Sequence, residues 1–282
     1  SYHFIDKYSR LFGTVWLLRR LNICPNAYYN YRKHRKNART VRKAFILNTI
    51  KDIYHSAGGR PGYRMMQQIL ANKGIMLSAH TVHNYMNREL GLKSVTRKAK
   101  YHYCKGTEAF KVFDNLLSQD FRADTRNQKW CVDFTYIYFA DHKKRYNCTI
   151  IDLYDRRVVA SVCGARINTE LAITTLTKAL ASAGNKTGMI LHSDRGSQFT
   201  SKEFTEFCKE KGVVQSMSKP GCPYDNAPME RYFNTLKAEL INIHSYWTEA
   251  QLYEEVTAYA YGWYNNLRPH SFNDGLPPAK VS

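Results

Sequence analysis

The sequence predicts an α/β core, built on a mixed five-stranded sheet with helices, preceded by an all-α region. Two observations predict this fold class. Helical spacing of apolar residues dominates residues 1–100, whereas β-rich and helical runs alternate from residue 128 onward. The charge divides the chain in the same way, because residues 1–100 carry +17 of the total net charge of +19. We therefore expect a basic helical front joined to a nearly neutral α/β domain.

Composition narrows the class of protein further. No apolar run approaches the roughly 20 residues that span a bilayer, and no signal-peptide pattern opens the chain. The seven cysteines are scattered and form no CxxC pair, which favours a reducing cytosol over a disulfide framework. The concentrated positive charge predicts a polyanionic partner, and nucleic acid fits better than a membrane surface because the basic segments lack a consistent apolar face.

The front of the chain is expected to consist of basic helices. Apolar residues recur at helical spacing over 4–21, and a break follows before Pro25, which is well placed as the first residue of the next helix. A further amphipathic helix is predicted over 39–56, before the breaker GGRPGY. We assign residues 1–50 to a basic helical N-terminal region.

Residues 51–100 are predicted to form a helix-turn-helix DNA-binding domain. A helix that begins at Arg64 is followed by a turn, and a second helix runs from Ser78 as N-cap to Gly91. The candidate DNA contacts are Arg64, His80, His83 and Asn84. Any three-helix bundle shows a similar pattern, and the surrounding positive charge favours the DNA-binding interpretation.

Residues 101–127 are predicted to be a basic linker. Interleaved aromatic residues, among them Tyr101 and Tyr103, could stack on bases while the charges follow a phosphate backbone. An ordinary solvated connector explains the same composition equally well.

The core is expected over 128–245, with a helical extension over 246–282. Three β-rich runs separated by short polar turns predict an antiparallel meander. The order continues as helix, strand, helix, strand and helix, which is the order that a ribonuclease-H-like fold produces.

Three acidic residues are candidates for catalysis, namely Asp133, Asp194 and Glu230. They fall in a strand, at a strand end and at a helix start. Carboxylates delivered from rigid elements can hold two divalent cations about 4 Å apart, the arrangement used for phosphodiester chemistry. Hard oxygen ligands suit Mg²⁺, with Mn²⁺ as a substitute. Each residue also has an ordinary interpretation when it is taken singly. Asp133 could face water from an edge strand, Asp194 could be a common turn residue, and Glu230 could lie on a solvated helix face.

Other acidic residues are less suitable. Asp152 and Asp155 follow the second strand and are expected to be structural or peripheral, and Asp225 is expected to cap its helix. Glu239 lies on the same helix as Glu230 but about 180° around its axis, so it is discounted as a metal ligand. No histidine has zinc-ligand spacing on a convincing face.

The segments WCVDFTYI, HSDRGSQF and YDNAPMERYFNTLKAEL resemble the catalytic segments of DDE transposases and retroviral-type integrases. More narrowly, the chain resembles the second-frame (OrfB-type) transposase of the IS-three family of bacterial insertion sequences. GGRPGYRMMQQIL and YGWYNNLRPHSFNDGLPPAK extend the likeness to roughly residues 50–282.

The resemblance implies that Asp133, Asp194 and Glu230 are the metal ligands of a two-ion, Mg²⁺-dependent transposase. It implies that Lys237 contacts DNA beside the site, with Asn226, Arg268 and His270 in supporting or DNA-contacting roles. The implied partners are double-stranded DNA, as terminal inverted repeats and target, and further copies in a homodimer or higher oligomer. A first-frame transposase partner or fusion is possible, and the implied location is the DNA-associated bacterial cytoplasm.

Two other functions stay open on the residues alone. A ribonuclease-H-like nuclease without strand transfer would share the metal site, and a non-enzymatic helix-turn-helix regulator would share the basic front. The zinc-binding N-terminal module of retroviral integrases is absent from the sequence, which argues against that branch.

Overall fold

The computed structural model describes residues 1–33, 35–95, 113–139 and 143–281. Contacts divide the chain into two compact units, one of Ser1–Gly59 with His83–Leu92 and one of Arg60–Val82 with Lys93–Ser282. This grouping differs from the predicted domain boundaries, because the first helix of the predicted helix-turn-helix domain joins the core.

The first unit is helical throughout its described residues. Its elements are α1 (Tyr2–Phe12), α2 (Thr14–Arg20), α3 (Pro25–Arg32), α4 (Arg35–Ser56) and the π-helical η1 (Asn84–Glu89). Pro25 opens α3 as predicted. The expected single run over 4–21 is divided at Gly13, whose φ of 78° lies in the left-handed region that glycine tolerates best. A small apolar cluster joins α1, α2 and α3 through Ile5, Leu17, Leu18 and Tyr28.

In the second unit, α5 (Tyr63–Asn72) and α6 (Ala79–His83) confirm the predicted pair of helices. The Ser78 hydroxyl accepts a hydrogen bond from the Thr81 amide at 3.1 Å, as an N-cap does. The segment is fixed to the C-terminal part of the same unit. The Asn72 side-chain amide donates to the Gly275 carbonyl at 3.1 Å.

Arg60, from the predicted breaker, contributes more to this attachment. Its Nε donates to the main-chain carbonyl of Glu239 at 2.9 Å. Its guanidinium also lies over the rings of Tyr259 and Trp263, 5.8 and 5.7 Å from their centroids. Such cation–π contacts contribute on the order of 1 kcal/mol each when partly buried.

The predicted mixed five-stranded sheet is confirmed, with the strand order β3-β2-β1-β4-β5. The antiparallel meander consists of β1 (Lys129–Phe139), β2 (Lys143–Asp152) and β3 (Val158–Gly164). Parallel to β1 and to each other run β4 (Ile190–Ser193) and β5 (Val214–Met217). The sheet therefore changes from antiparallel to parallel at β1, in the middle of the sheet.

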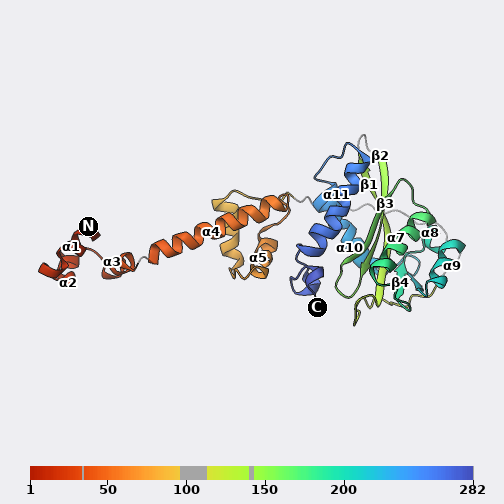
Figure 1. The fold of residues 1–282 in the computed structure, drawn as a ribbon, viewed down its shortest axis with the longest axis horizontal. Helices are drawn as coiled ribbons and strands as arrows, with labels where there is room; N and C mark the ends of the chain where they lie inside the picture. Colours follow the sequence, from red (N-terminus) through yellow and green to blue (C-terminus); the bar gives the residue numbers. More distant parts are fainter. Residues whose placement is uncertain (34, 96–112, 140–142, 282) are drawn as a thin grey trace. The chain divides into compact units, whose positions relative to one another are not determined.

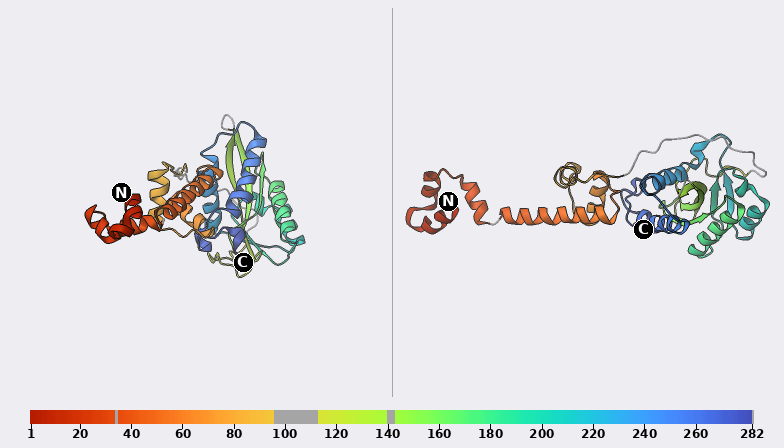
Figure 2. Two further views of the ribbon diagram at one scale, coloured as in Figure 1. Left: turned by 60° about the vertical axis from the view of Figure 1, so that its left-hand side comes forward. Right: turned by 90° about the horizontal axis from the view of Figure 1, so that it is seen from above.

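Helices cover both faces of the sheet, as Figures 1 and 2 show. On one face lie α7 (Thr169–Ser182), α8 (Ser197–Thr200) and α9 (Lys202–Glu210). The other face is covered by α10 (Ala227–Leu236), η3 (Lys237–Ile241), α11 (Glu249–Thr257) and η4 (Ala258–Tyr264). Short 3-10 turns are η2 (Pro223–Asn226), η5 (Ser271–Asn273) and η6 (Pro278–Lys280). The main core on the α7 side includes Trp130, Val132, Ile150, Leu176, Leu191 and Phe199.

The described part of the predicted linker packs against the core. The Leu116 amide donates to the Ser216 hydroxyl at 2.9 Å, and the Met217 amide donates to the Asp114 carbonyl at 3.2 Å. Leu117 is buried. The core therefore begins earlier than residue 128. Tyr101 and Tyr103 lie outside the described residues.

None of the helices in the described ranges is long and apolar enough to cross a membrane.

Candidate active site

The parallel pairing of β1 and β4 brings Asp133 and Asp194 together. Cys131 is paired with His192, so the same register places Asp133 level with Asp194, one residue beyond the end of β4. β-branched and aromatic residues surround Asp133 and stabilise its strand. Asp133 is therefore held by its pairing with β2, and Asp194 lies at the end of the neighbouring parallel strand.

Glu230 reaches the same region from the first turn of α10. Buried apolar side chains hold this helix against the core: Met229, Phe233, Leu236 and, in η3, Leu240. These residues recur at helical spacing and form the apolar stripe of α10 and η3. Glu230 lies beside this stripe and is half-buried.

The pKa of Asp133 is shifted by its burial and by two other carboxylates. Burial raises the pKa of Asp133 well above its ordinary value of 3.8, and the charges of Asp194 and Glu230 raise it further. Burial also raises the pKa values of Asp194 and Glu230. Clustered carboxylates of this kind disfavour one another's charge unless a cation joins them.

Main-chain amides orient two of the carboxylates. The Phe134 amide donates to Asp133 Oδ1 at 2.7 Å, and the Gly196 amide donates to Asp194 Oδ1 at 2.9 Å. A Cβ at Gly196 would lie 2.7 Å from Gln198 Oε1 and 3.0 Å from Asp194 Oδ1. A larger residue at this turn would therefore have to displace the Gln198 amide and crowd the Asp194 carboxylate. The second oxygen of each carboxylate remains available to a ligand.

No set of three or more His, Cys, Asp or Glu side chains in the described ranges is gathered closely enough to enclose a metal ion. The donor set nevertheless fits hard divalent cations, because it offers only carboxylate oxygens and carries excess negative charge.

Lys237, the first residue of η3, places a cation beside these carboxylates. Burial lowers the pKa of its ammonium, while the charge of Asp133 favours protonation. Its Nζ lies 4.2 Å from the centroid of the Tyr136 ring. Tyr136 lies on the same strand as Asp133, and no local motif marks it as a functional residue.

Asn226 precedes Glu230 by about one helical turn and is only 6% exposed. Within the described part of the chain, neither its Oδ1 nor its Nδ2 has a hydrogen-bond partner. A buried amide without partners is costly, which suggests that a ligand or water completes its bonds.

Arg268 is engaged within the protein. Its guanidinium pairs with the buried Glu239 carboxylate, with Nη2 2.9 Å from Oε1 and Nε 2.9 Å from the same oxygen. Tyr259 and Trp263 donate to the other oxygen, Glu239 Oε2, at 3.0 and 2.9 Å. Glu239, which the sequence analysis discounted as a ligand, is thus the centre of a buried polar cluster. This cluster gives Arg268 a structural role.

His270 is held as a neutral imidazole. Burial and the charges of Arg268, Arg156 and Arg231 lower its pKa to about 4. Its Nδ1 accepts a hydrogen bond from the Phe272 amide at 3.4 Å, which only an unprotonated nitrogen can do.

Acidification is expected to destabilise the protein through His270. Its pKa is about 4 in the folded chain against an ordinary value of 6.5, so the unfolded chain binds the proton first as the pH falls. The stability that neutral His270 contributes is fully present above pH 6.5, the ordinary pKa. It is lost as the pH falls from 6.5 toward about 4, the pKa in the folded chain. Urea unfolding over this range should show the slope, and His270→Gln should reduce it. An unchanged slope would refute the assignment. His192, whose pKa is also about 4, supplies a separate part of the slope.

The helix-turn-helix candidates lie on α5, α6 and η1. Arg64 is exposed on α5, and His80 is exposed on α6. His83 ends α6 and Asn84 opens η1, and both are half-buried. These four remain predictions as DNA contacts.

Asp225 does not cap α10 as expected. Its carboxylate accepts hydrogen bonds from the side-chain amides of Asn115 and Gln119, at 2.8 and 2.9 Å, and from the Lys219 amide at 2.8 Å. It therefore ties the loop before α10 to the segment before β1. Asp152 and Asp155 also bind neighbouring main-chain amides, in line with their expected structural roles.

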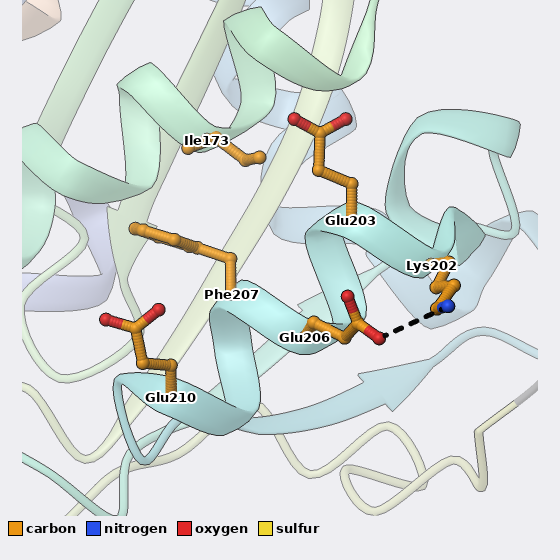
Figure 3. A pocket seen from close by; sticks show the side chains of 6 residues that line it. All are labelled: Ile173, Lys202, Glu203, Glu206, Phe207 and Glu210. Atoms are coloured by element: carbon orange, nitrogen blue, oxygen red, sulfur yellow. Dashed lines mark ion pairs between the residues drawn. The ribbon is translucent and has the colours of Figure 1, made fainter.

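A pocket lies on the α7–α9 face of the sheet, opposite α10 (Figures 1 and 3). Ile173 and Phe207 form its apolar part, and the polar side chains are Lys202, Glu203, Glu206 and Glu210. Lys202 pairs with Glu206 at 3.8 Å. Three carboxylates against one ammonium repel phosphate, so this pocket is unsuited to a nucleic-acid backbone.

Three family models match the chain. One integrase core domain model matches residues 123–223 and a second matches residues 211–278. An HTH-like domain model matches residues 41–100. Together the matches cover both the basic front and the core.

The chain is similar to curated bacterial transposases along most of its length. The transposase for insertion sequence element IS904 of Lactococcus lactis is 32% identical, and the match covers 86% of this chain and 96% of the relative. The putative transposase InsK for IS150 of Escherichia coli is 30% identical, and the match covers 93% of this chain and 90% of the relative. The transposase InsF for IS3A of Escherichia coli is 29% identical, with 99% and 96% covered.

Among solved structures, a simian T-cell lymphotropic virus intasome with PP2A regulatory subunit B56 gamma matches with a TM-score of 0.45 and 15% identity, over 82% of this chain and 73% of that one. The HTLV-2 integrase catalytic core domain with magnesium matches with a TM-score of 0.41 and 19% identity. The match covers 55% of this chain and 95% of that one.

Proposed function

The chain belongs to the IS3 family of insertion-sequence transposases, and from this premise we propose that Asp133, Asp194 and Glu230 form its two-metal active site. As a DNA transposase it binds DNA and transfers polynucleotide strands. The proposal concerns which residues perform that transfer and with which ions.

The register of β1 against β4, which sets Asp133 level with Asp194, supports this assignment most. The charges of Asp194 and Glu230 both raise the pKa of Asp133, as expected if each of them lies within electrostatic reach of it. Two divalent cations held between them would remove the repulsion. The all-oxygen ligand set favours Mg²⁺, with Mn²⁺ as a substitute.

The residues would divide the work as follows. Asp133 and Asp194 fix two ligand positions from adjacent parallel strands, and Glu230 closes the set from α10. The carboxylates would hold cations that, when bound, would activate the attacking oxygen and stabilise the leaving oxygen. Lys237 would donate to phosphate oxygens and bring the phosphodiester to the carboxylates. Water would attack the phosphodiester first and break its P–O3′ bond, which leaves a 3′-hydroxyl and a 5′-phosphate. The 3′-hydroxyl would then attack a phosphodiester of the second strand and release the 3′-oxygen of that strand as a hydroxyl.

Recognition of the element ends would lie mainly with the basic front. Arg64, His80, His83 and Asn84 are proposed to contact the terminal repeats, within the region that the HTH-like model matches. Asn226 is proposed to complete its hydrogen bonds on DNA at the active site. Joining paired ends requires more than one DNA end, so we propose a dimer or higher oligomer on DNA.

A cleavage and joining assay tests this function. The purified protein with Mg²⁺ and DNA carrying its own element ends is expected to cut and join strands, and a chelator should stop both steps. Joining in the presence of chelator would contradict the metal mechanism. Cutting without joining would indicate a nuclease, and binding without cutting would indicate a regulator.

A further inference from the structure

Lys237 rests on an aromatic ring although acidic groups lie nearby. Its Nζ is 4.2 Å from the centroid of Tyr136. Asp133 is near enough for its charge to favour the protonated ammonium. Among the described residues, however, Lys237 forms no ion pair and no side-chain hydrogen bond, and its contact with the Tyr136 ring stands alone. The Tyr136 ring is therefore the contact that locates the ammonium.

Tyr136 is suited to this contact by its place on β1. It follows Asp133 by three residues on the same strand, within the part paired to β2. Its side chain is 44% exposed, which is unusual for a large aromatic residue in a central strand. The exposed ring does not fill the core, so packing alone does not explain it.

A ring is a better holder of this ammonium than a carboxylate would be. An acidic partner would compete for the divalent cations and would repel incoming phosphate. The face of a neutral ring attracts the ammonium through its quadrupole and carries no net charge. The ammonium can then leave the ring for a phosphate oxygen without leaving a buried charge behind.

We propose that Tyr136 is a positioning residue that holds the Lys237 ammonium within reach of Asp133 before DNA arrives. The proposal rests on the proposed function for its catalytic consequence. The contact itself is a property of the metal-free protein and is tested independently.

The chain provides a matched control in Tyr138. It lies two residues further along β1, on the same face of the strand, and is 37% exposed. Its ring lies 5.7 Å from that of Tyr136 at 67°. No contact with Lys237 is among its interactions in the described residues. Tyr138→Leu therefore removes a comparable exposed ring without removing the one beneath the ammonium.

The first measurement uses the metal-free full chain with ¹³C-labelled lysine. The ε-methylene signal of Lys237, assigned by its loss in Lys237→Arg, is expected upfield of ordinary lysines because of the ring current of Tyr136. The signal should return to the ordinary position in Tyr136→Leu and stay upfield in Tyr136→Phe and Tyr138→Leu. An unshifted signal in the wild type, or no change in Tyr136→Leu, would overturn the proposal.

The second measurement is a double-mutant cycle on the strand-transfer rate at saturating DNA. Tyr136→Leu is expected to lower the rate about 10-fold, while Tyr136→Phe restores most of it. In the Lys237→Met background, Tyr136→Leu should cause no further loss. Equal losses in both backgrounds would show that the ring acts on DNA or on the fold, and the proposal would be overturned. An inactive wild type with an upfield Lys237 signal would refute the proposed function while supporting the contact.

Discussion

Glu230→Gln is expected to lose both strand cleavage and strand joining while retaining binding to the element ends. The change preserves the size of the side chain but removes the charge that a divalent cation requires. Since metal ions supply several kcal/mol of transition-state stabilisation, the loss should be on the order of 10³-fold or more in rate. The basic front, which carries most of the positive charge, is unaltered.

Glu203→Gln is the control for this variant. Glu203 lines the acidic pocket (Figure 3), and its helix α9 lies on the face of the sheet opposite α10 (Figure 1). The same change of charge there should leave the rate within about two-fold of the wild type. Equal losses in both variants would indicate a general effect of charge, and full activity of Glu230→Gln would remove Glu230 from the site.

Arg268→Met is expected to destabilise the fold by about 3–5 kcal/mol. The Arg268 side chain is 18% exposed and that of Glu239 is 7% exposed, so the remaining carboxylate would be left nearly buried without a cation. Two hydrogen bonds from Tyr259 and Trp263 compensate only part of its charge. The free energy of unfolding, measured with urea, checks the effect.

The companion change Glu239→Gln in the Arg268→Met background should recover part of the loss, because a neutral amide can keep the two aromatic donors. If Arg268→Met lowered the free energy of unfolding by less than about 1 kcal/mol, that result would contradict a structural role for Arg268. Such a result, together with weaker DNA binding, would restore Arg268 to the DNA-contacting residues.

The sequence predicts elements well where local pattern determines them. The β-rich runs around Asp133 became β1, and the apolar stripe of α10 became a buried face. The choice among the acidic residues came from their positions at element ends and from the family likeness. The order of the strands depends on long-range pairing, which local pattern does not contain.

Long-range partners explain what the sequence could not predict. Asp225 sits at a helix start, where a capping role is usual, but its partners Asn115 and Gln119 lie 110 and 106 residues earlier. Glu239 is separated from Glu230 by its angle on the helix. That same angle directs it to Arg268, 29 residues later, and no local pattern indicates this pairing.

Exposure also limits what a sequence shows. Tyr136 belongs to an alternating strand pattern in which an aromatic residue is expected to pack in the core. Only the structure shows its ring partly exposed beneath Lys237, a residue from a different element. The break at Gly13 is a similar case, since glycine is tolerated within helices and its positive φ appears only in the fold.

Binding of Mn²⁺, followed by electron paramagnetic resonance, tests the metal site most directly because it does not depend on DNA. The wild-type protein is predicted to bind about two ions per chain at the carboxylates. Asp133→Asn removes the most central of the three ligands and is predicted to abolish this binding, while Glu203→Gln preserves it. Equal Mn²⁺ binding by the wild type and Asp133→Asn would contradict the account.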